Sequence, residues 1–229
     1  MTAGIAVFDR RSGTFSHRLN TDLRFRSASV VKLLIALDRL ADFRTPEGIS
    51  RDERQRLGLM LRSSDDGVAS RYWESEGGPA VLTRTAGRLG LRGLRPPPPE
   101  FPGHWGYTGL TAADTVRIYR HLLEDAPGWV RELVLGELRA ATPLGTDGFD
   151  QRFGIPSAFR RPWAVKQGWS GFGGPREPVL HTTGTVGEDD RCVVAVLTRH
   201  PAGTGYRTAG ARVTALCGGL AVPGAAATG

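Results

Sequence analysis

The chain has 229 residues, and its 30 Lys and Arg against 23 Asp and Glu give a formal net charge of +7 with neutral histidines. That length suits one large domain with a proper core, and a chain with 40% hydrophobic and 23% charged residues is not an intrinsically disordered one. No apolar run approaches the roughly 20 residues that a membrane-spanning helix needs, so no membrane segment is expected. Two cysteines, Cys192 and Cys217, exclude a disulfide scaffold and a multi-cysteine metal site.

The positive charge is carried by scattered arginines that alternate with acids, as in Arg51-Asp52-Glu53-Arg54. This pattern favours a solvated surface, and we expect no nucleic-acid partner. The first five residues lack a basic stretch followed by an apolar one, so no secretory signal is present as written. The sequence as written therefore predicts a cytoplasmic protein, and an extracytoplasmic one if the N-terminus is trimmed or misassigned.

Strand and helix patterns alternate along the first two thirds of the chain. Residues 4–19 predict a β-hairpin around a turn cluster at 9–13, and residues 27–40 predict a helix that is apolar on nearly every side and therefore buried. Further helices are expected over 51–62, 68–74, 79–89 and 129–139. Residues 92–110 predict a loop region with four consecutive prolines, after which Thr111 caps another helix.

The last third returns to strands. We expect strands over 163–169, 180–187 and 191–200, a closing helix over 206–220 and a flexible tail over 221–229. Strands at both chain ends can pair, so the sequence predicts an α+β fold with a five-stranded antiparallel sheet flanked by helices. In this single domain, 1–220, the sheet lobe comprises 1–26 and 155–220, and an inserted all-helical lobe comprises 27–154. The cleft between the lobes is the expected place for a site.

Lysine is rare in this chain: Lys32 and Lys166 are the only two, against 28 arginines. A buried lysine can lose its proton and act as a base, whereas arginine cannot, so these two lysines are candidate functional residues. Lys32 follows Ser29 by three residues at the start of the buried helix, which places both side chains on one helix face. An amine with a lowered pKa can activate a serine hydroxyl as a nucleophile. The alternative is a serine cap followed by a lysine that extends to solvent.

Two further short motifs accompany Ser29-Val30-Val31-Lys32. Ser64-Asp65-Asp66 lies between two predicted helices, and Lys166-Gln167-Gly168 lies on a predicted strand. With the flanking sequences 25–33, 60–69 and 76–90, these motifs resemble the serine β-lactamase/penicillin-binding protein (DD-peptidase) family, in its class A β-lactamase-like branch. The resemblance runs over most of residues 4–220.

The resemblance implies an acyl-enzyme mechanism. Ser29 would be the acylated nucleophile, Lys32 its base, and Ser64 the group that passes a proton to the leaving amine. Lys166 would supply positive charge near a substrate carboxylate, and the backbone N–H groups of Ser29 and Trp169 would form an oxyanion hole. Asp66, Gln167 and Gly168 complete the predicted substrate-binding set. Neither a metal nor a cofactor is implied.

Three departures from the family pattern disfavour efficient penicillin hydrolysis. Asp66 stands where the family has Asn, so an amide donor is replaced by a carboxylate, which could pair with Lys32. Gln167 stands where the family has Thr, which removes a hydroxyl. The loop glutamate that directs water for deacylation has no counterpart, because Glu100 is the only acid in 92–110 and its surrounding sequence matches poorly. His104, beside Trp105, is a remote further candidate.

The sequence therefore leads first to a serine hydrolase that acts on an amide or ester of a small molecule or peptide, such as a β-lactam. That activity would connect the protein with penicillin binding and antibiotic resistance. A D-Ala-D-Ala carboxypeptidase, or a small-molecule esterase or amidase, would use the same residues. A third hypothesis is a non-catalytic module that binds a peptide or β-lactam.

Overall fold

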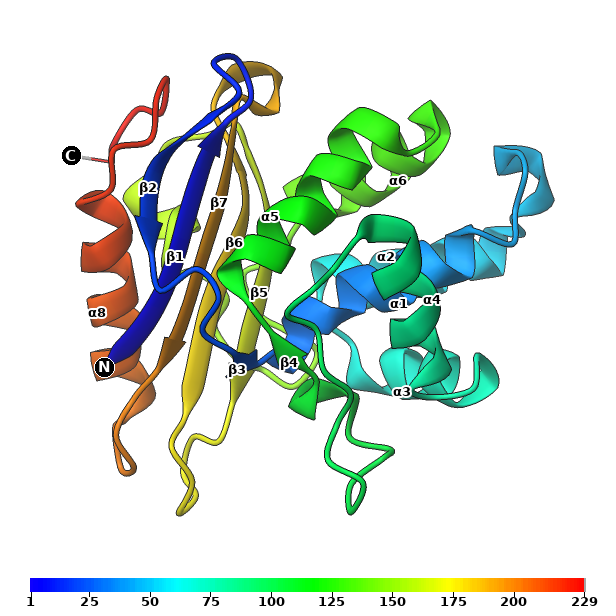
Figure 1. Ribbon diagram of the computed structural model, residues 1–229, viewed down its shortest axis with the longest axis horizontal. Helices are drawn as coiled ribbons and strands as arrows, with labels where there is room; N and C mark the ends of the chain where they lie inside the picture. The colour runs from blue at the N-terminus through cyan, green and yellow to red at the C-terminus, as the bar shows by residue number, and fades with distance from the viewer. Residues whose placement is uncertain (229) are drawn as a thin grey trace.

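The computed structural model describes residues 1–228, arranged in three layers. A central five-stranded antiparallel sheet has the strand order β2-β1-β7-β6-β5. Helix α8 covers one face, and α1, α5, α6 and the other large helices lie on the opposite side (Figure 1). The predicted α+β fold, with a sheet assembled from both ends of the chain, is confirmed.

The strands match the predicted β segments within one or two residues. They are β1 (Thr2–Asp9), β2 (Thr14–Leu19), β5 (Trp163–Ser170), β6 (Val179–Val186) and β7 (Cys192–Arg199). The N-terminal β1 pairs with β7 along its whole length, from Thr2 opposite Arg199 to Asp9 opposite Cys192. Because β6 is covered on both faces, it is buried throughout, and its threonines hydrogen-bond within the sheet region rather than to water. A small second sheet joins β3 (Phe25–Arg26) to β4 (Gly109–Leu110).

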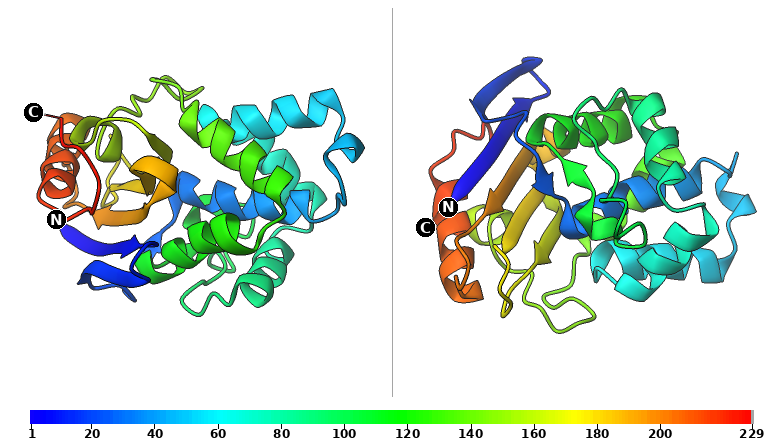
Figure 2. Two further views of the ribbon diagram at one scale, coloured as in Figure 1. Left: turned by 90° about the horizontal axis from the view of Figure 1, so that it is seen from above. Right: turned by 60° about the horizontal axis from the view of Figure 1, so that its bottom comes forward.

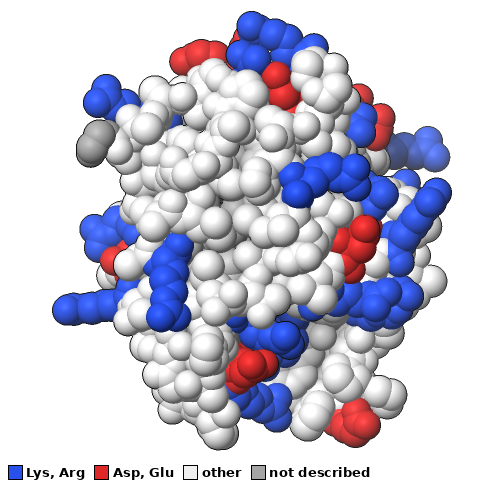
Figure 3. Space-filling view, turned by 60° about the vertical axis from the view of Figure 1, so that its left-hand side comes forward, with Lys and Arg blue, Asp and Glu red and all other residues white. Residues whose placement is uncertain are grey.

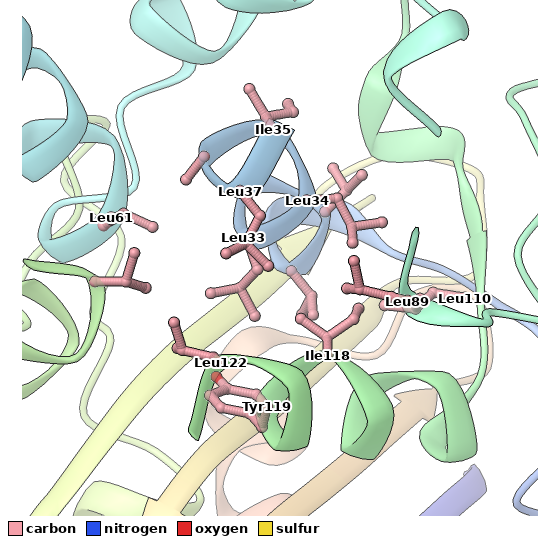
Figure 4. Packing of buried hydrophobic residues seen from close by; sticks show 14 of the residues in the cluster. Leu33, Leu34, Ile35, Leu37, Leu61, Leu89, Leu110, Ile118, Tyr119 and Leu122 are labelled. Atoms are coloured by element: carbon pink, nitrogen blue, oxygen red, sulfur yellow. The ribbon is translucent and has the colours of Figure 1, made fainter. Parts of the chain in front are cut away.

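The longer helices occupy the predicted segments of the middle of the chain and its end, and the short α7 (Ile155–Ala158) was not predicted. The helices are α1 (Lys32–Leu40), α2 (Arg51–Arg62), α3 (Asp66–Ser75), α4 (Ala80–Leu89), α5 (Ala112–Arg120), α6 (Gly128–Arg139), α7 and α8 (Tyr206–Gly218), with the 3-10 turns η1 (Ala28–Val31), η2 (Pro46–Gly48), η3 (Trp105–Tyr107) and η5 (Glu188–Asp190) and the π-helical turn η4 (His121–Asp125). Eight of the nine residues of α1 are buried. Figure 4 shows leucines of α1 surrounded by apolar side chains of α2, α4 and α5, which belong to the same hydrophobic cluster.

Two hydrophobic clusters lie on the two faces of the sheet. The first combines α1–α6 with sheet residues such as Ala6, Phe8 and Leu197, and the second joins the opposite sheet face to α7 and α8. The helices inserted between β2 and β5 therefore share one core with the sheet. The predicted two lobes are two parts of one packed unit, seen from two further directions in Figure 2.

Residues 221–228, which the sequence predicts to be a flexible tail, contact the rest of the protein. Arg160 N donates to Ala226 O at 2.8 Å, Thr228 N donates to Ala158 O at 3.1 Å, and Cys192 Sγ contacts Pro223 O at 3.3 Å. These contacts hold residues 221–228 against the α7 side of the sheet, because the small residues there let their backbone approach closely. Gly229 lies outside the described residues.

On the face that Figure 3 displays, arginine side chains lie among uncharged and some acidic residues, and both lysines are buried. Many arginines are paired, as in the contacts of Arg191 with Asp9 and Arg62 with Glu137. Within residues 1–228 no helix is both long enough and apolar enough to cross a membrane.

Candidate functional site

The predicted nucleophile lies where η1 packs against the edge strand β5. Ser29 is the second residue of η1, the turn that directly precedes α1, and it is almost completely buried. Gly168 on β5 makes this contact close: a Cβ atom there would lie 3.0 Å from Val30 Cγ2 and 3.1 Å from Ser27 O. Ala28, which precedes Ser29, has a φ of +45°. A non-glycine residue in this left-handed region is strained, as backbone positions at functional sites often are.

The turn between α2 and α3 carries the second motif. Ser64 also has a left-handed backbone, with a φ of +57°, and Asp65 caps α3 by accepting a hydrogen bond from Val68 N at 2.7 Å. The segment that follows α6 holds the turn from outside, since Thr146 N donates to Ser63 O at 2.9 Å. The backbone conformation therefore fixes where the Ser64 hydroxyl points.

The Ser64 hydroxyl lies between the two lysines of the chain. Lys166 Nζ is 2.7 Å from Ser64 Oγ, and Lys32 Nζ is 3.3 Å from the same atom. Both lysines are 0% exposed. Three of the predicted catalytic and binding side chains, from α1, the α2–α3 turn and β5, thus meet at one point.

Lys32 has further partners that stabilise a positive charge. Its Nζ donates to Ser64 O at 2.5 Å and to Asp66 Oδ1 at 2.6 Å, and it lies 4.7 Å from the centre of the Trp105 ring. The predicted Ser29–Lys32 contact is thus replaced by contacts to Ser64 and Asp66. Burial lowers the pKa of Lys32, while the Asp66 carboxylate opposes that shift.

Lys166 is in a different electrostatic setting. Besides Ser64, the one hydrogen-bond partner of its Nζ among the described residues is the carbonyl oxygen of Gln167, at 3.3 Å. Burial lowers the pKa of Lys166 well below its ordinary value, and the positive charge of Lys32 lowers it further. The two amines of the site therefore differ in the charge that their surroundings favour.

A cavity of about 470 Å³ opens beside Ser29. Ser29, Asp66 and Trp169 line it, together with His104, Trp105 and Tyr107 from the loop before β4. The lysines and Ser64 lie beneath this cavity rather than on its wall. Of the described residues that line it, Asp66 is the only acid.

The loop of residues 101–107 forms the aromatic side of the cavity. Trp105 Nε1 donates to Ser70 Oγ at 3.0 Å. Arg176, in the connection between β5 and β6, donates from Nη1 to Tyr107 Oη at 2.6 Å. Glu100, the sole acid of the 92–110 region, is exposed and outside the lining of the cavity. His104 lies at the rim against Phe101 and Tyr107.

Side chains alternate along β5, so Lys166 and Gly168 face η1 and the turn while Gln167 and Trp169 face the other way. Gln167 Nε2 donates to Gln151 O at 3.0 Å and Phe153 O at 2.8 Å, so this side chain ties β5 to the neighbouring loop. Trp169 stacks on Phe149 with 4.6 Å between ring centres, and its Nε1 donates to Asp147 Oδ2 at 2.9 Å.

The sequence did not single out Asp147, nor Trp105 as a neighbour of Lys32. Both lie in irregular segments whose course has no periodic signal. The aromatic content of residues 101–107 was the one available hint. Within residues 1–228 no group of three or more His, Cys, Asp and Glu side chains could hold a metal ion.

No model of a known protein family matches the chain. Among curated proteins, it is 38% identical over 206 residues to the protein named "Putative lipoprotein LppW" in Mycobacterium tuberculosis (strain ATCC 25618 / H37Rv), and equally to that of Mycobacterium bovis. The match covers 88% of this chain but 64% of those relatives, so the chain spans less than two thirds of their length.

Among solved structures, the fold resembles a class A β-lactamase from Mycobacterium abscessus, with a TM-score of 0.73 and 20% identity over 95% of this chain and 91% of that one. A class A β-lactamase from Bacteroides cellulosilyticus gives the same TM-score of 0.73 at 14% identity, over 94% and 89% of the two chains. The motif resemblance is thus confirmed at the level of the fold. The protein has the fold of the class A serine β-lactamases.

Proposed function

We propose that the protein is a serine hydrolase that forms an acyl-enzyme on Ser29 with an amide or ester substrate, and that a β-lactam ring is one such substrate. The observation that carries the proposal is the Ser64 hydroxyl held at 2.7 Å from Lys166 and 3.3 Å from Lys32, beside a cavity that reaches Ser29. Burying two lysine side chains lowers the stability of the fold, because buried charges lose their hydration. Two amines that share one hydroxyl can, however, transfer protons during a reaction.

The reaction would begin with attack of Ser29 Oγ on the carbonyl carbon of a substrate in the cavity. Backbone N–H groups of Ser29 and Trp169 would stabilise the oxyanion, since β5 packs directly on η1. Ser64 would protonate the leaving nitrogen or oxygen. Asp66 and Trp169 line the cavity and would contact the substrate, whereas Gln167 and Gly168 would act by fixing β5 in place.

The acyl-enzyme would be long-lived. Hydrolysis of the ester needs a base that can deprotonate a water molecule near Ser29. Asp66, the only acid among the described residues that line the cavity, is engaged at 2.6 Å by Lys32. We therefore propose that acylation is the faster half of the reaction and that β-lactams act mainly as covalent ligands.

The site of action is proposed to lie outside the cytoplasm, because the relatives at 38% identity carry the name of a lipoprotein. Digestion of the protein by protease added to spheroplasts of the source cell would support this location. Protection in intact spheroplasts, with digestion only after lysis, would contradict it.

The intact mass of the protein after mixing with a penicillin tests the proposed reaction. Ser29→Ala removes the nucleophile, and Ser12→Ala, in the distant β1–β2 turn, is the matched control. We expect an adduct of the mass of the drug on wild type and Ser12→Ala and none on Ser29→Ala, while the β-lactam absorbance falls by about one equivalent. A lasting adduct that survives in Ser29→Ala would contradict the assignment of the nucleophile.

Two other outcomes lead elsewhere. Rapid loss of absorbance over many equivalents, with no lasting adduct, would contradict slow deacylation and show a working β-lactamase. Neither adduct nor absorbance change, with saturable binding of the intact drug, would replace the hydrolase by a binding module.

A further inference from the structure

The two lysines of the site share one hydroxyl but not one electrostatic environment. The Nζ of Lys32 contacts a carboxylate oxygen of Asp66 at 2.6 Å, a backbone carbonyl at 2.5 Å and the face of the Trp105 ring at 4.7 Å. Each of these neighbours stabilises an ammonium ion. Lys166 has only Ser64 Oγ at 2.7 Å and the Gln167 carbonyl at 3.3 Å, and no salt bridge to it is formed within residues 1–228.

The charged groups that act on Lys166 come from three packed elements. Lys32 of α1 repels a second positive charge, while Asp66 of α3 and Asp147 of the loop before β5 attract one. Asp147 is exposed and bonded to Trp169, and Asp66 already faces Lys32. On the β6 side, Tyr119 and Thr183 hydrogen-bond to each other, and Thr183 contacts the carbonyl of Lys166 rather than its amine.

Of the two buried amines, only that of Lys32 contacts a carboxylate among residues 1–228. A single ammonium ion can be compensated by Asp66, but a second would be a buried charge without a partner, which proteins avoid by releasing the proton. The amine that releases it is the one farther from the carboxylate. Burial and the positive charge of Lys32 both lower the pKa of Lys166. Burial also lowers the pKa of Lys32, but the Asp66 carboxylate raises it.

Building on the proposed function, we propose that Lys166 is the neutral amine that accepts the proton during acylation, and that Lys32 is a fixed ammonium ion. In this arrangement Lys32 donates to Ser64 Oγ, and the Ser64 hydroxyl donates to Lys166 Nζ. The Ser64–Lys166 part of the relay is thus in place in the resting protein, and during acylation the proton of Ser29 would pass through Ser64 to Lys166.

The proton balance of the step is complete without any other reactant. As Ser29 Oγ bonds to the carbonyl carbon, its proton passes to Ser64 Oγ and the Ser64 proton passes to Lys166 Nζ. When the carbon–nitrogen bond of the substrate breaks, Ser64 gives its proton to the leaving nitrogen and recovers one from Lys166. Lys166 ends as the neutral amine with which it began, and the Ser29 proton has moved to the leaving group.

The composition of the chain makes a direct test available, because Lys32 and Lys166 are its only lysines. Protein labelled with ¹³C at the lysine Cε positions, and ¹⁵N at Nζ, gives two side-chain signals in the full-length, substrate-free protein. At about pH 7 we expect one signal at the ammonium position and one at the amine position, since a free lysine titrates near 10.4. Asp66→Asn assigns them, because it changes the immediate contact of Lys32 and should move that signal more.

The result expected is that Lys166 gives the amine signal and gains its proton only on acidification. Two ammonium signals at neutral pH, or an amine signal that belongs to Lys32, would overturn the proposal. This readout requires no substrate. If Ser29 is acylated while Lys32 is the amine, the proposed function stands and only the assignment of the base is wrong.

The rates of acylation give a second measurement. Arginine keeps its proton, so Lys166→Arg should slow adduct formation by at least about 10²-fold, the usual contribution of a general base. Lys32→Arg keeps the positive charge beside Asp66 and should be the milder substitution. The reverse order of the two variants would contradict the proposal. Where the larger side chain prevents folding, the wild-type titration alone decides.

Discussion

Asp66 sets the charge of the relay, so the substitution Asp66→Asn should change its pH dependence. The carboxylate raises the pKa of Lys32 and, more weakly, that of Lys166. Removing it therefore lowers both pKa values, and the amine form that accepts the proton becomes available at a lower pH. We expect the acid limb of the acylation rate to move to lower pH.

The size of the shift follows from the geometry of the pair. Lys32 is 0% exposed while the Asp66 side chain is 70% exposed, with 2.6 Å between Nζ and Oδ1. Charges about 4 Å apart interact by about 4 kcal/mol at an effective dielectric constant of 20, and fully exposed pairs by about 0–1 kcal/mol. For a half-exposed pair we take about 1–2 kcal/mol, which is about one pKa unit. That value applies to Lys32. Asp66 forms no salt bridge with Lys166 within residues 1–228, so the pKa of the proton acceptor should fall by less than about one unit, and below the midpoint the acylation rate should rise by less than about tenfold.

The assay is the rate of adduct formation with a penicillin, measured by intact mass across a pH series. Asp52→Asn, at the exposed far end of α2, removes the same charge at a distance and serves as the control. An acid limb that does not move, or that moves equally in the control, would show that the Asp66 charge does not act on the proton acceptor. Thermal unfolding of both variants confirms that the fold is unchanged.

Three further predictions concern stability and packing. Lys166→Met replaces a buried amine with an apolar side chain of similar volume and should stabilise the fold by about 1–4 kcal/mol, raising Tm by at least about 2 °C while abolishing adduct formation; a lower Tm would contradict it. The pKa of Lys166 is lower in the folded protein than in the unfolded chain, so between these two pKa values the unfolded chain binds more protons. The free energy of unfolding should therefore rise with pH up to about 10. Urea unfolding should show that this rise is smaller in Lys166→Met. Gly168→Ala places a methyl group 3.0 Å from Val30 Cγ2 and should slow acylation at least about tenfold by moving β5 from η1, whereas Gly87→Ala, in open space on α4, should leave the rate unchanged and raise Tm slightly.

The fold was largely predictable from local patterns. Alternation and turn residues located the hairpin of β1 and β2, and the absence of a polar face identified α1 as buried. Short-range signals also located the start of α5, where Thr111 accepts the predicted hydrogen bond from Asp114 N at 3.0 Å. The Asp114 side chain, however, turns to the backbone of residues 92 and 93. The orientation of the Asp114 side chain depends on the position of residues 92 and 93, which the sequence around Asp114 does not reveal.

The candidate site was predictable as a set of residues but not as an arrangement. The motifs singled out Lys32, Ser64 and Lys166, and the structure brings their side chains together. Helical spacing suggested that Lys32 faces Ser29, yet its amine is drawn instead to Ser64 and Asp66. The reason is electrostatic: a buried ammonium ion turns toward the nearest carboxylate and carbonyl oxygen, and these come from a turn more than 30 positions away.

In the proposed reaction, the contacts of Asp66 and Trp105 would favour acylation over deacylation. Their contacts keep Lys32 charged, which leaves the second amine, Lys166, to take up a proton through Ser64. The same contacts occupy the only acid among the described residues of the cavity wall, so a water molecule beside the ester on Ser29 finds no free carboxylate. The arrangement that directs the proton during acylation is therefore also the reason that the acyl-enzyme should persist.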